Sequence, residues 1–570
     1  MGNHSSSPDM GSPNATVLQQ FILRPILLIV IVLSLVYPAT AIAAVKNVIV
    51  LIMDGCGDEQ LTLARWYKGS PLALDAILVG AVKTHNADSV IPDSASAGTA
   101  YAAGVRTNSG VVSLSPKAAT IPPASTHILK TPLQPCATVL EGARLLGKST
   151  GVVVTCRISH ATPATYMAHT PSRKMDEDIT EQAVYQNIDV VMGGGKKYFR
   201  PQSAGGNRQD QEDLISVLQT HGYQVIQNRT ELHKLDKGKV FGLFAPNHLE
   251  AEIDRLECAP EQPSLAEMTR KAIQLLSANP AGFFLLVEGS QIDWACHAHD
   301  PAHLIGDLLM FDRAVQAALD FAQKDGQTLL LALPDHNTGG MSIGNQCSDH
   351  YYTRLQPEAL IAPLKKMQLS APTLWRRVGK DKTPEKIKDT VIRYWGIQLT
   401  EKDAQEILKK AEQYGKNAHN AFGEVICPKY TDIGWTTHGH TGGDIPLFAC
   451  GPHRPVGLLD APDIGRLTAE AMDLDLNLLS ARLFVEARQA FPAQAVRLDH
   501  TDPDNPVVRI SYHDRQASLP VNKNLLYWGE EVLPLEGVVV YLPETETTYL
   551  PVQAIQAIKG ESKPLPPITK

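Results

Sequence analysis

Repeated runs of apolar residues constrain the fold of this 570-residue chain more than any other feature. The first run, Val48 to Met53, is continuous and rich in β-branched residues, as in a strand buried on both faces. Similar runs recur at Val152 to Val154, Asp189 to Met192, Phe283 to Val287, Thr328 to Leu333 and Phe448 to Gly451. Helical patterns lie between them, at Leu265 to Leu276 and Leu304 to Phe321, and a closing helix is predicted at Ile464 to Met472. The alternation predicts an α/β fold with a large, mostly parallel sheet sandwiched between helices.

Polar residues follow the carboxyl ends of these runs. They are Asp54, the His160-Ala161-Thr162 segment, Glu288 and the Asp335-His336 pair. Ligands of open α/β sheets bind beyond the carboxyl ends of the strands, so we expect these side chains to converge on one site. A lone residue of this kind is more often a cap or a hydrogen-bonded structural residue, and only the whole set argues for chemistry.

Other residues extend the set of potential metal ligands. Asp293 and His297 are four residues apart, so they would share one face of a helix and could bind one ion together. His438 and His440 add two imidazoles. Carboxylates and imidazoles suit catalytic zinc, whereas carboxylates with the hydroxyl of Thr162 suit magnesium.

The segment from Pro92 to Gly104 contains a serine that follows an aspartate and precedes a run of very small residues. Such a run predicts a helix that packs too closely for larger side chains. Ser94 would lie in its first turn, where the helix dipole and backbone N–H groups favour an anion. Ser94 is therefore a candidate nucleophile, although serine is also a good N-cap residue and a purely structural role is the alternative.

Together these residues resemble the alkaline phosphatase family over roughly Val45 to Leu474. The matching stretches are VIVLIMDGCG, PDSASAGTAYAAGV, SHATPATYMAHTPSR, VEGSQIDWACHAHD, PDHNTGG and HGHTGGDIPLFACGP. The resemblance implies hydrolysis of phosphate monoesters to an alcohol and inorganic phosphate, through a phosphoserine intermediate. It also implies two zinc ions and one magnesium ion as cofactors, small phosphomonoesters as substrates, and a homodimer.

The resemblance further implies a role for each matching residue. Ser94 would be the nucleophile, and the Arg173 guanidinium would bind two phosphate oxygens, a bidentate role that Lys does not fill equally. The ligands of the first zinc would be Asp293, His297 and His440. The ligands of the second zinc would be Asp54, Asp335, His336 and Ser94. The magnesium ligands would be Asp54, Thr162 and Glu288.

A few positions depart from the family's pattern or need a choice. Trp294 stands where other members carry Lys or His, and His160 stands where some carry Asp. Both are expected near the phosphate or the magnesium, as candidate substrate-binding residues. Of His438 and His440, the Thr-Gly-Gly-Asp that follows favours His440 as the ligand. The cysteines beside ligand positions, Cys56 and Cys296, are expected to be structural, given the oxygen and nitrogen character of the site.

The N-terminal 44 residues predict a signal peptide. An apolar run from Pro25 to Tyr37 follows Arg24, and small residues extend to Ala44. We therefore expect export to the periplasm or the extracellular space, with no permanent membrane span after cleavage; an uncleaved anchor is the alternative. Export would permit disulfides among the eight cysteines, of which Cys136–Cys156 is one conceivable pair. The net charge of −8 argues against nucleic-acid binding.

The remaining sequence divides into a large domain, an insertion within that domain and a C-terminal extension. Residues 45–475 form the predicted catalytic domain, interrupted at 345–430 by a helical insertion that is either a lid near the active face or a solvated surface element. Residues 476–570 predict a β-rich extension with strands at Val507 to Tyr512, Gly537 to Leu542 and Thr548 to Val552.

Two alternative functions are weighed against phosphomonoester hydrolysis. A related phosphodiesterase would usually lack the magnesium set, and a sulfatase would need a C-x-P-x-R segment. The nearest stretch to such a segment, Cys258 to Gln262, lacks the arginine. An exported scaffold or surface-binding protein would normally have lost ligands or the nucleophile, and none is missing here.

Overall fold

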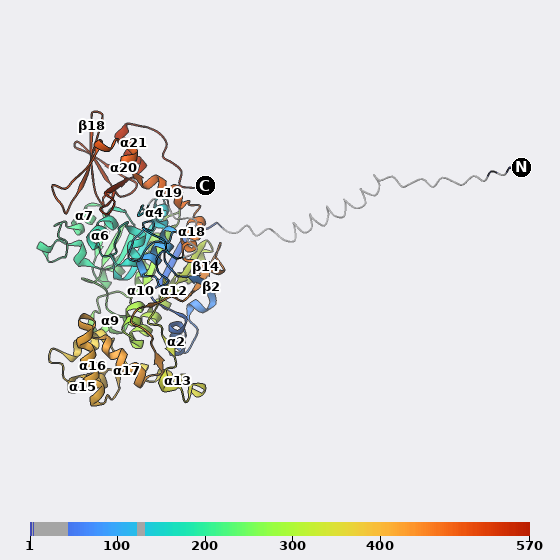
Figure 1. Ribbon diagram of the computed structural model, residues 1–570, viewed down its shortest axis with the longest axis vertical. Coiled ribbons are helices and arrows are strands. Elements are labelled where there is room, and N and C mark those ends of the chain that lie inside the picture. Colours follow the sequence, from blue (N-terminus) through green and yellow to red (C-terminus); the bar gives the residue numbers. More distant parts are fainter. Residues whose placement is uncertain (3, 5–43, 122–131, 570) are drawn as a thin grey trace. The chain divides into compact units, whose positions relative to one another are not determined.

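The computed structural model describes residues 1–2, 4, 44–121 and 132–569. Val45–Lys570 form one compact unit (Figure 1). The predicted signal segment lies almost entirely outside the described residues. Among the helices of the described part, none combines the length and the apolar character that crossing a membrane requires.

A ten-stranded sheet forms the centre of the unit, in the order β14-β2-β13-β8-β1-β7-β3-β4-β6-β5. Its strands are β1 (Asn47–Met53), β2 (Leu78–Lys83), β3 (Ser149–Arg157), β4 (Val190–Gly194), β5 (Gln224–Ile226), β6 (Val240–Leu243), β7 (Phe283–Gly289), β8 (Thr328–Leu333), β13 (Ile445–Cys450) and β14 (Gly457–Asp460). Every neighbouring pair is parallel except the two pairs that β13 makes with β2 and β8. The predicted large, mostly parallel sheet is confirmed.

Strand β1 illustrates why the central runs are apolar throughout. All seven of its residues are buried, and it pairs with β7 on one side and β8 on the other. Ile49 and Leu51 pack into the hydrophobic core on one face of the sheet, whereas Val50 and Ile52 pack into the core on the other. Because each large apolar side chain contributes about 1.5–3 kcal/mol when fully buried, neither face of such a strand favours a polar residue.

Helices supply the other half of both cores. One core contains α2 (Asp58–Lys68), α10 (Leu265–Leu276) and α12 (Pro301–Asp325). The other contains α3 (Ser94–Ala103), α4 (Val139–Leu145), α5 (Ala161–Met167), α6 (Asp176–Tyr185), α7 (Leu214–Thr220), α18 (Ala461–Ala471) and α19 (Leu476–Leu483). The sheet is therefore sandwiched between helical layers, as the alternation predicted.

The stretch 345–430, described throughout, is helical and contains no strand. Its α-helices are α13 (Pro357–Ile361), α14 (Ala371–Val378), α15 (Pro384–Trp395), α16 (Glu401–Tyr414) and α17 (Asn420–Tyr430). Trp395 is fully buried and its indole N–H donates to the Leu369 carbonyl at 2.8 Å. Trp395 and Phe422 pack into the same core as α2, α10 and α12. The stretch is thus built onto the main fold as a packed element.

The C-terminal region holds two small antiparallel sheets (Figure 1). One contains β16 (Val496–Asp499), β17 (Val507–Tyr512), β18 (Arg515–Pro520), β19 (Leu525–Trp528) and β20 (Glu531–Pro534). The other contains β15 (Val485–Glu486), β22 (Thr547–Leu550) and β21 (Val540–Leu542), and α21 (Val552–Lys559) follows. This region has a hydrophobic core of its own. It also contacts α6, because the Asn522 amide donates to Asp178 at 2.8 Å.

All eight cysteines are unpaired in the structure. The conceivable Cys136–Cys156 bridge is therefore wrong. Helix α4 begins only at Val139, and the Cys136 thiol donates to the Gln134 carbonyl at 3.4 Å. Cys156, at the end of β3, instead donates to the Glu288 carboxylate at 3.4 Å.

Candidate active site and metal centre

The four central strands β8, β1, β7 and β3 are neighbours and run parallel, so their carboxyl ends meet at one edge of the sheet. Each end carries predicted site residues. Asp335 and His336 follow β8, Asp54 follows β1, Glu288 is the second-last residue of β7, and His160 and Thr162 follow β3. Apart from His160, which is 9% exposed, these side chains are completely buried.

Helix α3 presents Ser94 to this edge. Asp93, not Ser94, is the N-cap residue, because its carboxylate accepts from the Ser96 backbone N–H at 3.1 Å. The Ser94 hydroxyl is thus free of the capping role and lies 3.2 Å from His336 Nε2. All ten residues of α3 are buried, and a Cβ on Gly98 would lie 2.6 Å from the Thr165 hydroxyl of α5. This close packing explains the small residues and holds the N-terminus of the helix in place.

One group of ligand-type side chains surrounds Ser94. His336 Nε2 lies 3.1 Å from Asp335 Oδ2 and 3.7 Å from Asp54 Oδ1. Asp54, Asp335 and His336 each place a ligand atom within 4.8 Å of the other two. Backbone N–H groups of Gly55 and His336 donate to Asp335 Oδ1 at 3.0 and 2.9 Å, which fixes that carboxylate. The structure therefore brings together the residues predicted for the second zinc.

A second group adjoins the first. Asp293 and His297 lie on α11 (Gln291–His297), with His297 Nε2 3.1 Å from Asp293 Oδ2. His440 Nε2 lies 3.3 Å from His297 Nε2 and 3.7 Å from Asp293 Oδ1. The Nδ1 atoms of His297 and His440 contact the backbone carbonyls of His438 and Pro92 at 2.5 and 2.9 Å. Such contacts orient imidazoles so that Nε2 is left for an ion.

His438 and His440 take different positions in the structure. His440 reaches the group because β12 (His440–Thr441) pairs with β9 (Asn337–Thr338), just beyond His336. The His438 ring turns the other way, with Nε2 3.1 Å from the Tyr414 hydroxyl. The structure brings His440 to Asp293 and His297, and leaves His438 outside.

The buried negative charge of the site is only partly balanced by the adjacent histidines. Burial, followed by the charges of Asp335 and Asp293, raises the pKa of the Asp54 carboxyl well above its usual range. Burial likewise raises the pKa of Glu288 to about 7. Both Asp54 oxygens and Glu288 Oε1 are buried without a hydrogen-bond partner. Since buried charges are normally paired or coordinate metals, this donor set fits divalent cations.

Arg173, His160 and Trp294 form one side of the site. Arg173 Nη1 donates to Asp93 Oδ2 at 2.9 Å, and Nη2 lies 3.4 Å from His160 Nε2. The His160 ring packs edge-on against Trp294, with ring centroids 5.5 Å apart. The guanidinium is thus held beside the N-terminus of α3. The structure brings these three predicted residues together.

A cavity of about 830 Å³ opens beside this side of the site. Trp294 and His297 line it from α11, and Arg376, Tyr414 and Asn420 line it from the 345–430 stretch. The cavity lies within the size range of small-molecule sites. The insertion therefore contributes side chains next to Asp293 and His297, in keeping with a position near the active face.

Sequence reasoning missed two residues that the structure adds. The Thr338 hydroxyl donates to Asp293 Oδ1 at 2.5 Å, and only tertiary structure places it there. Cys156 lies against Glu288, and its position at the end of a predicted strand was the signal that could have found it.

Comparison with known proteins identifies the group to which this geometry belongs. A family model described as alkaline phosphatase matches residues 45–474. The chain belongs to the alkaline phosphatase family. It is therefore an enzyme of phosphate monoester hydrolysis and a member of a metal-dependent family. This finding argues against the scaffold alternative.

Curated relatives and solved structures agree with this assignment. Alkaline phosphatase 3 of Bacillus subtilis is 34% identical, over 76% of this chain and 90% of its own. The alkaline phosphatase of Schizosaccharomyces pombe is 31% identical, over 82% and 87%. The crystal structure of a cold-active alkaline phosphatase from a psychrophilic Shewanella species aligns with a TM-score of 0.62 and 30% identity, over 75% of this chain and 99% of that one. The Thermus thermophilus alkaline phosphatase aligns with a TM-score of 0.67 and 26% identity, over 75% and 91%.

The protonation of His297 predicts a pH-dependent metal affinity. Burial lowers the pKa of this imidazole, but the Asp293 carboxylate outweighs burial and raises the pKa to about 9. If His297 binds a zinc ion, that ion must displace the proton, and the apparent zinc affinity would then fall about tenfold for each pH unit below 9. Competition with a chromogenic chelator across this pH range measures the slope. In His297→Gln the slope should decrease by about one proton; an unchanged slope would contradict the assignment.

Proposed function

We propose that this alkaline phosphatase acts through a phosphoserine at Ser94, in a site that binds two zinc ions and a third divalent cation. The observation that carries the proposal is the position of Ser94. Its hydroxyl lies at the N-terminus of α3, 3.2 Å from His336 Nε2, and the same nitrogen lies 3.1 Å from the buried Asp335 carboxylate. No base other than this ligand-type imidazole contacts the hydroxyl in the described part of the chain.

The two zinc positions follow from the two groups of ligand-type side chains. Asp293, His297 and His440 would hold one ion. Asp54, Asp335 and His336 would hold the other, beside Ser94. For the third cation the family resemblance implies magnesium, with Asp54, Thr162 and Glu288 as ligands. When bound, the ions lower the pKa of a coordinated hydroxyl or water and neutralise charge on the phosphoryl oxygens.

The residues of the chain supply the remaining parts of the mechanism. The Ser94 hydroxyl gives up its proton and its oxygen attacks phosphorus, while the P–O bond to the alcohol breaks and the alcohol leaves with a proton. Water then attacks the phosphoserine, which breaks the bond between Ser94 and phosphorus, releases inorganic phosphate and restores the hydroxyl. The N-terminus of α3 and the Arg173 guanidinium stabilise the phosphoryl oxygens. The ion pair with Asp93 holds Arg173 in place, since both residues belong to the wall beside Ser94. The alcohol portion of the substrate would face the 830 Å³ cavity that His297 and Trp294 line.

Substrate preference tests the function directly. A monoester presents two or more charged oxygens to Arg173 and the cations, whereas a diester replaces one of them with a second ester group. We expect kcat/KM for p-nitrophenyl phosphate to exceed that for bis-p-nitrophenyl phosphate by orders of magnitude. A preference for the diester would favour the phosphodiesterase alternative instead.

Arg173→Lys is expected to weaken phosphate binding. Lysine keeps the charge but cannot make two parallel hydrogen bonds, and a hydrogen bond to a charged group contributes about 1.5–3 kcal/mol. The KM for p-nitrophenyl phosphate and the inhibition constant of inorganic phosphate should therefore rise about 10- to 100-fold. Arg65→Lys is the matched control, because Arg65, on α2, makes a bidentate pair with Asp75. Equal effects of the two substitutions would refute the role of Arg173.

We also propose that residues 1–44 direct export and are removed, which leaves a protein without a permanent membrane span in the periplasm or outside the cell. Residues 45–475 would then be the catalytic domain, with 476–570 as an extension and a homodimer as the assembly. N-terminal sequencing of the secreted protein tests the cleavage, and sedimentation of the same sample tests the dimer.

A further inference from the structure

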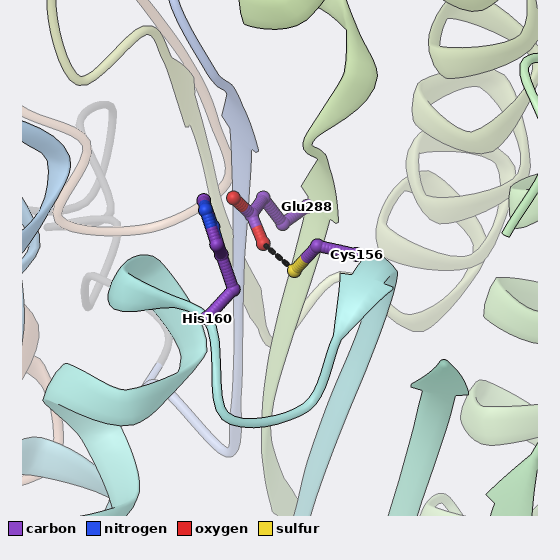
Figure 2. A group of neighbouring side chains, drawn as sticks. All are labelled: Cys156, His160 and Glu288. Atoms are coloured by element: carbon purple, nitrogen blue, oxygen red, sulfur yellow. Dashed lines mark hydrogen bonds between the residues drawn. The ribbon is translucent and has the colours of Figure 1, made fainter. Parts of the chain in front are cut away.

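A third group of ligand-type side chains lies at the ends of β3 and β7. It consists of Cys156, His160 and Glu288, each of which places a ligand atom within 4.8 Å of the other two. In Figure 2 the Glu288 carboxylate lies between the His160 ring and the Cys156 thiol. All three residues are buried. This is the position for which the resemblance implies magnesium.

Several atoms around this group lack the partners that burial normally demands. His160 Nδ1, Glu288 Oε1 and the Thr162 hydroxyl are buried without a hydrogen bond, and so are both oxygens of the neighbouring Asp54. A single unsatisfied atom has little meaning, but several unsatisfied atoms on neighbouring residues fit a missing cation. Apart from Asp54, none of these residues belongs to either zinc group.

The donors on the β3 side do not fit magnesium. Magnesium takes oxygen ligands in a near-octahedral arrangement and retains several waters, whereas sulfur and imidazole nitrogen suit zinc and its neighbours in the transition series. Cys156 and His160 supply one sulfur and one imidazole. A buried cysteine can instead be a plain structural residue, and its hydrogen bond to Glu288 is compatible with that role. A structural cysteine keeps its thiol proton when metal is added, whereas a cysteine that binds the metal loses it.

We propose that the third cation position is a zinc-class site in which the Cys156 thiolate binds the ion together with the His160 imidazole and the Glu288 carboxylate. Binding forms a metal–sulfur bond and breaks the S–H bond, whose proton leaves to solvent, and no electron is transferred. The inference rests on the proposed function only in taking this point as the third cation position of the same site. Cys156 thus makes the site selective against magnesium.

Cobalt substitution tests the metal–sulfur bond. Co²⁺ bound to a thiolate absorbs in the near ultraviolet through sulfur-to-metal charge transfer, and oxygen or nitrogen ligands do not give this band. Titration of the metal-free full chain with Co²⁺ should produce the band for one equivalent out of three. A millimolar excess of Mg²⁺ should leave it in place. Absence of the band, or its loss in magnesium, would overturn the proposal.

Two variants test which cysteine supplies the sulfur that binds the metal. Cys156→Ala should abolish the band and weaken binding of the third zinc equivalent at least tenfold. Cys296→Ala is the matched control, since Cys296 is equally buried and lies on α11 beside Asp293. That variant should keep the band, and a band lost in Cys296→Ala but kept in Cys156→Ala would refute the assignment. Should Cys156→Ala fail to fold, the magnesium competition on the unmodified chain still decides.

Failure of this inference can be told apart from failure of the proposed function. If acid-quenched enzyme contains phosphoserine but cobalt-substituted enzyme shows no cobalt–sulfur band, the proposed function holds and only the assignment of Cys156 as a ligand fails. If the cobalt–sulfur band is present but phosphoserine is never detected, the inferred metal site holds and the proposed mechanism fails.

Discussion

Ser94→Ala is expected to eliminate phosphoserine formation and nearly all turnover. The substitution removes the hydroxyl that lies 3.2 Å from His336 Nε2, and loss of a covalent nucleophile lowers kcat by up to about 10⁶-fold in a serine hydrolase. Steady-state hydrolysis of p-nitrophenyl phosphate measures the rate. Acid quench with labelled substrate measures the phosphoenzyme.

Ser96→Ala is the control for this experiment. Ser96 belongs to the same helix and is equally buried, but its hydroxyl contacts Asp93 at 2.9 Å and lies on the capping side. The Asn86 amide also donates to this hydroxyl, at 3.1 Å, so the substitution removes two hydrogen bonds. We expect a loss of about 2 kcal/mol in stability and turnover within a few-fold of the unmodified enzyme. Substantial activity in Ser94→Ala would mean direct attack by water and a different mechanism.

Removal of metal is expected to abolish activity and to destabilise the fold. Four carboxylates, those of Asp54, Glu288, Asp293 and Asp335, are buried around the site and only partly balanced by the adjacent histidines. A ligand at 1,000 times its dissociation constant stabilises the folded state by about 4 kcal/mol, so each ion contributes on that scale. Dialysis against a chelator should therefore eliminate turnover and lower the melting temperature by several degrees or more.

Addition of Zn²⁺ should restore both properties, and Ca²⁺ is the control because it prefers six to eight oxygen ligands. Activity and melting temperature are measured on the same samples, so that loss of fold and loss of chemistry are separated. An enzyme whose activity survived chelation would contradict the metal assignment.

The sequence predicted the elements whose burial leaves a strong pattern. The runs at Val48 to Met53 and Thr328 to Leu333 are strands because both faces of the sheet are covered, and Leu265 to Leu276 is a helix with those bounds. The β2 strand was missed because it lies near the sheet edge and most of its residues are half-buried or exposed. The antiparallel direction of β13 could not be predicted either, because an apolar run does not indicate whether its strand pairs in parallel or antiparallel.

The candidate site was predictable to the extent that its residues follow strands. Asp54 and Glu288 could be placed together at the carboxyl end of the sheet, because neighbouring parallel strands end on the same side. The orientation of His438 toward Tyr414 depends on a helix that the sequence places far away, and no local signal reveals it. From the sequence, Cys156 is predicted only as a possible disulfide partner, because the predicted export favours disulfides. Its contact with Glu288 depends on the pairing of β3 with the neighbouring strand β7.

The pairing of β12 with β9 has a consequence for the order of assembly. It places His440 beside residues that precede it by more than a hundred positions, and Asp54 belongs to the first strand of the fold. A growing chain therefore lacks a complete ligand set until most of it has been synthesised, and the long-range contacts that complete the set form slowly. Zinc uptake should accordingly be a late event in biogenesis, and a chain truncated before residue 440 should not retain the ion of the Asp293 group.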